Sequence, residues 1–174
     1  MHKRLTQIVT GLIISCLLGA CGFQLRGSGA TTVLPDSWKS MHLVTSNRYS
    51  ELSREVITRF AANGVQWEER DAANYRVILK PEQFEQRNLA LNSEARAAEF
   101  ELTMSTRFTV LDAENNVAMV ETDVAVIKQM ENDPRNVVGK AEEVRLLKSE
   151  MRVELAQQIM RRIGFYAAST QTNP

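Results

Sequence analysis

The residue whose type and setting most clearly imply chemistry is Cys21, in the stretch LLGACGFQLRG at 17–27. A thiol there could end a buried helix, form half of a disulfide, or be modified covalently. Leu18 stands three places before it, and Gly19 and Ala20 fill the gap. This pattern resembles the bacterial lipobox, in which the thiol forms a thioether to diacylglycerol, the chain is cut before the cysteine, and the new amine is acylated. Cys21 is therefore the candidate lipid-attachment residue.

The segment before Cys21 has the character of an export signal. A basic head that includes Lys3 and Arg4 is followed by a mostly apolar run, which is too short and too polar to cross a membrane. We therefore predict a lipoprotein signal peptide at 1–20; the alternative is an ordinary signal peptide with an incidental cysteine. Cleavage would remove Cys16 and leave Cys21 without a disulfide partner, which lipidation explains. Gly22 in place of Asp resembles an outer-membrane address, on the periplasmic side.

Charge and histidine content restrict the possible functions. The chain has 21 basic and 21 acidic residues, and loss of Lys3 and Arg4 would leave a net charge of about −2, so we expect no nucleic-acid partner. His42 would be the last histidine, which excludes Ser-His-Asp triads and histidine-rich metal sites. We expect a non-enzymatic protein without a cofactor or metal, and a structural role for His42.

The elements that must position any site follow from the hydrophobic periodicity. Residues 21–39 read as a lipidated N-terminus and tether, 40–165 as one domain, and 166–174 as a disordered tail. Within the domain we predict strands at 40–45, 74–85, 97–111 and 117–129, and helices at 50–64 and from about 134–140 to Gly164. Pro81 interrupts the second strand and indicates an edge or a bulge.

This order, β-α-β-β-β-α, predicts an α+β fold: a two-layer sandwich with a four-stranded mixed sheet covered by two helices. The apolar positions of each strand fall on one face and those of each helix form one stripe. The residues predicted to face the core are Phe100, Leu102, Met104, Phe108, Val110, Val120, Val124, Val126, Val144, Leu147, Met151, Leu155, Ile159 and Ile163.

Topology predicts that basic residues gather at one end of the domain. A right-handed crossover makes the first two strands parallel, and hairpins alternate thereafter. The residues expected at this basic end are Arg48, Arg87, Arg96, Lys128, Arg135 and Lys140. The opposite end of the domain is expected to carry the mainly acidic residues 68–71, with Asp112 and Glu114. Such polarity would turn the domain toward an anion. The alternative is ordinary solvated charge, diluted by Glu94, Glu131 and Asp133, with Lys140 paired to Glu143.

Four stretches carry a resemblance to a known family. They are CGFQLRG beside the anchor, ELSREV with NGV on the first helix, AAEFELTMSTRFTVLD as the long strand, and NDPRNVVGKAEE before the last helix. In order and spacing the chain resembles the lipopolysaccharide-assembly lipoprotein family, LptE. The resemblance implies a small sheet with two helices that plugs the outer-membrane β-barrel LptD, helps that barrel assemble, and binds lipopolysaccharide during its delivery to the cell surface.

The resemblance also implies site residues. Lipopolysaccharide binding in the family is attributed to basic residues near the sheet's hairpin tip and at the start of the last helix. Lys140 matches the second position, whereas the counterpart of the first is Ser93, so Arg96 or Arg87 would take its place, with Arg135 nearby. The physical basis of such binding is charge-assisted hydrogen bonding between these basic side chains and the phosphate groups of lipopolysaccharide.

Near the anchor, Phe23, Leu25 and Arg26 are candidates for contact with the partner barrel.

The alternative functions are a non-enzymatic lipoprotein adaptor in outer-membrane protein assembly and an envelope hydrolase. The missing histidines disfavour the hydrolase.

Overall fold

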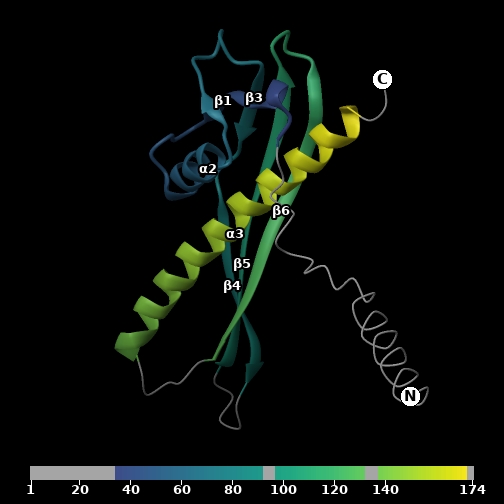
Figure 1. Ribbon diagram of the computed structural model, residues 1–174. Coiled ribbons are helices and arrows are strands. Elements are labelled where there is room, and N and C mark those ends of the chain that lie inside the picture. Colours follow the sequence, from purple (N-terminus) through teal and green to yellow (C-terminus); the bar gives the residue numbers. More distant parts are fainter. Residues whose placement is uncertain (1–33, 92–96, 132–136, 172–174) are drawn as a thin grey trace, which may run out of the picture. The chain divides into compact units, whose positions relative to one another are not determined.

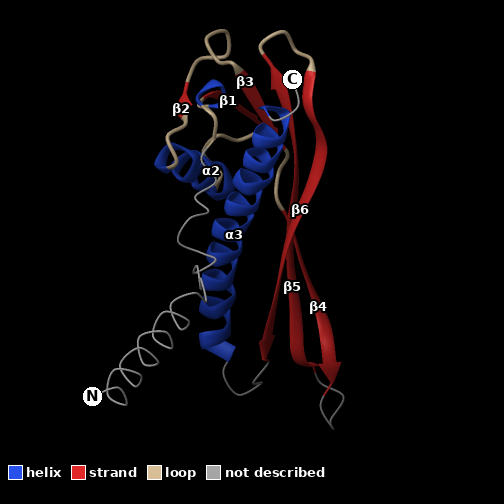
Figure 2. Cartoon of the chain, turned by 45° about the vertical axis from the view of Figure 1, so that its right-hand side comes forward, coloured by secondary structure: helices blue, strands red, loops and turns tan. Residues whose placement is uncertain are grey.

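The computed structural model describes residues 34–91, 97–131 and 137–171. Figure 1 shows a mixed sheet with two helices packed on the same face, and Figure 2 shows the long strands edge-on beside α3. The elements in chain order are η1 (Asp36–Trp38), β1 (Ser40–Thr45), α2 (Glu51–Ala62), β2 (Gln66–Trp67), β3 (Tyr75–Leu79), β4 (Gln83–Leu91), β5 (Ala97–Asp112), β6 (Val117–Glu131) and α3 (Val137–Gln171). The predicted two-layer α+β class is confirmed.

The sheet is mixed in the way that the crossover predicts. β1 pairs with β3 in parallel, and the two-residue strand β2 pairs in parallel with the other edge of β1. β3, β4 and β6 all pair with β5 in antiparallel register. Because β6 follows one edge of β5 from Leu111 to Glu99, β3 and β4 must share the opposite edge, end to end.

The strand predicted at 74–85 is therefore two strands in line, and it continues to Leu91. Leu79 pairs with Phe108 and Gln83 with Ser105, so four steps along this strand oppose three along β5. The extra residue is a bulge at Pro81, which has no N–H to donate. This break, together with β2, raises the strand count from the predicted four to six.

The first helix begins and ends where the sequence predicts. Ser50 caps α2 by accepting a hydrogen bond from the backbone N–H of Ser53 at 3.2 Å. Gly64 follows the helix with φ of +89°, a conformation that glycine adopts at little cost. Leu52, Val56 and Phe60 form the buried stripe of the helix.

The core lies between the helices and the inner face of the sheet, which is the face that carries Leu102, Met104 and Phe108. Met151, Leu155, Ile159 and Ile163 of α3 are fully buried there, as the periodicity predicts. Val120 is the exception: it is 71% exposed, and the prediction that it faces inward was wrong. A register shift between Phe108 and Val110 inserts an extra β6 residue here and turns Val120 outward.

Both ends of the predicted domain extend further than the sequence suggested. Leu34 and Trp38, placed in the tether, are buried in the core. The last helix does not end at Gly164, as predicted, but continues to Gln171. Beyond that glycine, Ala167 is fully buried and the Tyr166 ring meets Trp38 edge-on at 5.9 Å. This packing outweighs the cost of about 1 kcal/mol for a glycine inside a helix.

Candidate functional site

Lys140 lies in the first turns of α3, beside the far part of β5. Its Nζ atom stands 3.9 Å from the centre of the Phe100 ring, which is itself almost completely buried. The ring face attracts the ammonium group and helps to hold it where α3 meets the sheet. Lys140 is thus a cation whose position is set by packing, close to the start of α3.

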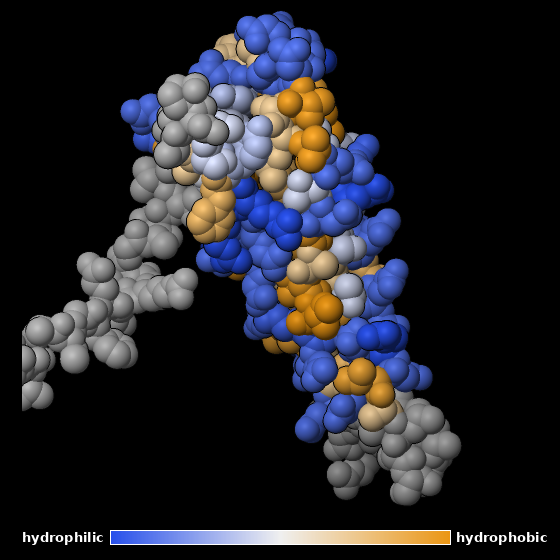
Figure 3. Space-filling model, turned by 90° about the vertical axis from the view of Figure 1, so that its right-hand side faces the viewer, coloured by the Kyte–Doolittle hydropathy of each residue, from blue (hydrophilic) through white to orange (hydrophobic). Residues whose placement is uncertain are grey.

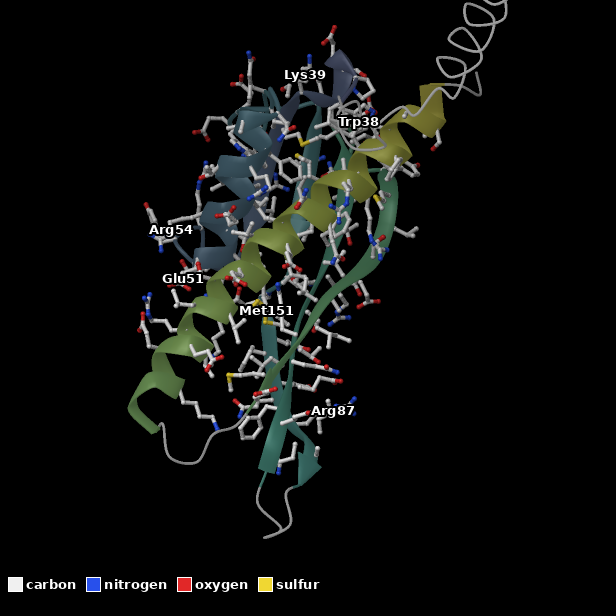
Figure 4. All side chains as sticks on the ribbon, turned by 60° about the horizontal axis from the view of Figure 1, so that its bottom comes forward. Trp38, Lys39, Glu51, Arg54, Arg87 and Met151 are labelled. Carbon is white, nitrogen blue, oxygen red and sulfur yellow. The ribbon has the colours of Figure 1, made fainter. Side chains whose placement is uncertain are left out.

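Arg87 lies on β4 and faces away from the helices. It pairs with Glu101, the neighbour of Phe100 on β5, and successive residues of a strand point to opposite faces. The sheet therefore separates Arg87 from Lys140, and Figure 4 shows the Arg87 side chain directed away from α3. We call this face, which carries Arg87 and Glu101, the outer face.

A carboxylate already engages Arg87. Its Nε donates to Glu101 Oε1 at 2.7 Å, and this hydrogen bond, with the charge of Glu101, raises the pKa of the arginine. The Arg87 side chain is 71% exposed, whereas that of Glu101 is 13% exposed. A ligand anion on the outer face would thus compete with Glu101.

The candidates Arg96, Arg135, Cys21, Phe23, Leu25 and Arg26 lie outside the described residues.

Two further basic residues do not join Lys140 as the topology suggested. Lys128 points inward and forms ion pairs with Glu154 and Glu150 of α3. The hydrogen bond with Glu154 is the main cause of its raised pKa. Arg48 follows β1, whose last residue pairs with Leu79. From Leu79 to Leu91, the end of β4, the chain advances by twelve residues. At about 3.3 Å per residue this is about 40 Å, because the interrupted β3–β4 strand is longer than predicted.

Lys148 is a positioned cation that the sequence reasoning missed. Its Nζ stands 3.9 Å from the centre of the Phe84 ring on β4, the same arrangement as Lys140 over Phe100. The signal that could have revealed it is its spacing: eight residues after Lys140 is slightly more than two helical turns, so both lysines point toward the sheet.

Other kinds of site are limited among the described residues. His42 Nδ1 forms a hydrogen bond with the backbone carbonyl of Glu68 at 2.8 Å, a structural contact. Within 34–91, 97–131 and 137–171, no group of His, Cys, Asp and Glu side chains could hold a metal ion. In the same ranges, no helix is both long and apolar enough to cross a membrane.

The surface beside β6 is mostly hydrophilic, with separate apolar areas. Figure 3 shows these areas on the side of the molecule that lies to the right in Figure 1. The large exposed apolar residues of β6 are Val117, Val120 and Ile127, at 58%, 71% and 60% exposure. Near them, Arg107 forms an ion pair with Glu121 at 2.9 Å. A surface of this mixture suits a polar environment with a few apolar contacts.

Taken together, the described part of the chain is a small two-layer α+β domain whose candidate sites are surface cations held over aromatic rings and beside carboxylates. Positioned surface cations of this kind suit contact with anionic groups. A family model for lipopolysaccharide assembly, LptE, matches residues 38–163, so the chain belongs to the LptE family.

Individual relatives agree with the family. The chain is 26% identical to the LPS-assembly lipoprotein LptE of Photorhabdus laumondii over 164 residues, which cover 94% of this chain and 87% of the relative. It is 27% identical to the protein of the same name from Yersinia pestis over 167 residues, covering 94% and 77%.

Solved structures match as well. The crystal structure of rare lipoprotein B from Shewanella oneidensis has a TM-score of 0.65 and 29% identity, and the match covers 76% of this chain and 96% of that one. A solution structure of lipoprotein B from Nitrosomonas europaea has a TM-score of 0.69, 20% identity and coverage of 87% and 97%, and it supports the fold alone.

Proposed function

We propose that this chain is an outer-membrane lipoprotein that plugs the LptD β-barrel, assists the assembly of that barrel, and binds lipopolysaccharide on its way to the outer leaflet. The observation that carries the proposal is membership of the LptE family over residues 38–163. The role is non-enzymatic, because it consists of filling a barrel and contacting an anionic lipid. The anchor is Cys21, which holds the chain on the periplasmic side of the outer membrane.

The surface chemistry supports the plug. Exposed side chains of the outer face and the β6 edge are mainly polar, with an ion pair between Arg107 and Glu121 and isolated apolar residues such as Ile127. The interior of a large outer-membrane barrel is polar, so this surface could enter it without a large desolvation cost.

Co-purification tests the plug directly. A tagged form of the full chain, isolated in mild detergent, should bring down LptD in a stable complex. Recovery of a different assembly factor in place of LptD would instead favour the general adaptor in outer-membrane protein assembly. Recovery of no β-barrel protein at all would show that the plug proposal is wrong.

The position of Lys140 supports the ligand site. Its ammonium group is fixed over Phe100 at 3.9 Å, close to the start of α3, and can approach a lipopolysaccharide phosphate without leaving the ring. We expect Lys140→Asp to weaken lipopolysaccharide binding at least tenfold and to flatten its salt dependence. Arg70→Asp, an exposed residue of the loop before β3, is the matched control. Equal binding by both variants would remove Lys140 from the site.

The anchor has its own test. Cys21→Ala should abolish acylation, which mass spectrometry of the mature protein would detect as loss of the lipid mass. Normal lipidation of that variant would contradict the assignment of Cys21. Retention of the LptD complex by the unacylated variant is compatible with the plug, because a large interface can hold the subunit by itself.

A further inference from the structure

A cleft between α2 and α3 combines charged and hydroxyl side chains and has no apolar residue in its lining. Its volume is about 530 Å³, within the range of small-molecule sites. Four residues come from each helix, and the set contains four cations, two carboxylates and two hydroxyls. The lining residues are Glu51, Arg54, Glu55, Thr58, Arg145, Lys148, Ser149 and Arg152.

Two of the four cations already have carboxylate partners. Arg152 forms ion pairs with Glu51 and, at 2.7 Å, with Glu82. Arg145 pairs with Glu142, one helical turn earlier, at 2.6 Å. These contacts fix the guanidinium groups along the α3 side of the cleft while leaving some of their N–H donors available.

The other two cations are not neutralised by a protein carboxylate in the described part of the chain. Arg54 comes from α2, and Figure 4 shows it with Glu51 where α2 approaches α3. Lys148 comes from α3, and the Phe84 ring positions its ammonium group without cancelling the charge. Two available positive charges thus face the cleft from opposite walls, beside the hydroxyl groups of Thr58 and Ser149.

We infer that this cleft binds a phosphate group of lipopolysaccharide, as a second contact beyond Lys140. The inference rests on the proposed function, which supplies the ligand. A phosphate accepts several hydrogen bonds and prefers arginine, lysine and hydroxyl donors, and six of the eight lining residues are of these kinds. The other two, Glu51 and Glu55, already form ion pairs with Arg152 and Arg59. Lys148 lies eight residues from Lys140, or about 12 Å along the helix axis, so one molecule with several phosphates could reach both sites.

The lining favours this ligand over a segment of protein. Protein interfaces are centred on buried aromatic or aliphatic anchors, and the cleft offers none to pack against them. An acidic peptide would contribute charge but would leave its apolar side chains without partners. A phosphorylated sugar headgroup has only polar and charged groups to satisfy, which the cleft can do.

The test uses the full acylated chain in detergent and a double variant, Arg54→Gln with Lys148→Met. Methionine keeps an apolar side chain over Phe84, so the seam between α3 and β4 stays filled. We expect lipopolysaccharide to bind this variant about tenfold more weakly than the unmodified protein and with a smaller salt dependence. Lipopolysaccharide stripped of its phosphates should bind both proteins equally. Unchanged circular dichroism and a cooperative thermal transition, with a midpoint lowered by no more than a few degrees for the lost ring contact, would show that the fold is intact.

A matched double variant on α3, Arg161→Gln with Arg162→Met, removes two exposed cations outside the cleft lining and should bind lipopolysaccharide within twofold of the unmodified protein. The inference fails if the cleft variant binds as well as this control. In that case, weakened binding by Lys140→Asp would leave the proposed function standing, whereas unchanged binding by all variants would overturn both.

Two other results would also overturn the assignment. An equal loss of binding to phosphatidylglycerol micelles would assign the phosphate to a phospholipid headgroup. Loss of LptD co-purification with lipopolysaccharide affinity intact would make the cleft a site for an acidic segment of the barrel protein.

Discussion

The two halves of α3 face the same sheet but are attached to it by different interactions. The C-terminal half inserts fully buried apolar side chains, among them Leu155 and Ile159, into the core shared with α2 and the strands β5 and β6. In the N-terminal half, Leu147 is only partly buried and Leu146 is 51% exposed. The contacts there include Lys148 over a phenylalanine ring of the sheet.

This difference suits the C-terminal half of α3 to stabilising the fold and the N-terminal half to contacting a ligand. Close-packed apolar groups lose free energy steeply when they move apart, so the C-terminal half fixes the position of the helix. Long charged side chains can change rotamer at small cost and remain accessible to an anion. The same helix therefore holds the domain together at one end and presents Lys140 and Lys148 at the other.

The largest expected effect compares two leucines of α3 that lie two helical turns apart. Leu155→Ala should lower the free energy of unfolding by about 3 kcal/mol, because it leaves a cavity in a fully buried site. Leu147→Ala should cost only about 1 kcal/mol, since the side chain is partly in water already. Urea unfolding of the two variants measures both values, and equal losses would contradict the division of the helix into two regions.

Arg152 lies at the boundary between these regions and should give the next largest effect. Its side chain is 17% exposed and forms ion pairs with Glu51 and Glu82. Burial alone would lower the pKa of Arg152. The hydrogen bond with Glu82 and the charges of both carboxylates outweigh that effect, so the pKa of Arg152 is raised. Arg152→Met should cost about 1–2 kcal/mol, because it leaves two carboxylates without their partner.

The matched control for Arg152 is Arg107→Met on the outer face. Its ion pair with Glu121 is about half exposed, so its loss should cost at most about 0.5 kcal/mol. Unfolding in 1 M salt should shrink the smaller effect further and leave most of the larger one. A similar loss from both arginines would mean that the boundary is no better shielded from water than the open surface.

A smaller effect is expected at the bulge between β3 and β4, which lie in line along one edge of β5. Thr106 is buried, and its hydroxyl donates to the carbonyl of Lys80 at 2.7 Å. Thr106→Val keeps the shape but leaves that carbonyl without this donor, at a cost of about 1 kcal/mol. Thr103→Val, on the outer face of β5, should change the unfolding free energy by less than about 0.5 kcal/mol. Equal values would show that the bonded hydroxyl contributes nothing.

The bounds of α2 and the inner face of β5 follow closely from the sequence. Ser50, Asn63 and Gly64 mark the ends of α2, and the strict alternation from Phe100 to Val110 identifies the inner face of β5. These signals are local, because each depends on a few neighbouring residues and one period. The position of Val120 and the end of α3 were mispredicted, because a bulge against β5 and packing of Ala167 beyond Gly164 are tertiary effects that override local preference.

The candidate site could be predicted only in part for the same reason. Lys140 was proposed from its place in a motif, and the ring beneath it belongs to a strand forty residues earlier, which the motif does not reveal. The sequence placed Arg87 in a connection beyond the strand predicted at 74–85, whereas it lies inside β4, opposite Glu101 on the outer face. The α2–α3 cleft joins residues from 51–58 and 145–152, and no sequence spacing indicates such a pair of helix faces.

The smallest expected effect is the direct energy between Lys148 and Phe84, which tests how the N-terminal half of α3 is attached. A double-mutant cycle with Lys148→Met and Phe84→Leu should give a coupling of about 0.5–1 kcal/mol in unfolding free energy. Both substitutions keep apolar bulk, so the coupling isolates the attraction between the ammonium and the ring. A coupling near zero would mean that Lys148 only rests on the ring, and that apolar contacts such as Leu147 hold this half of the helix. A coupling in the expected range would show that the charge of Lys148 itself stabilises the seam between α3 and β4.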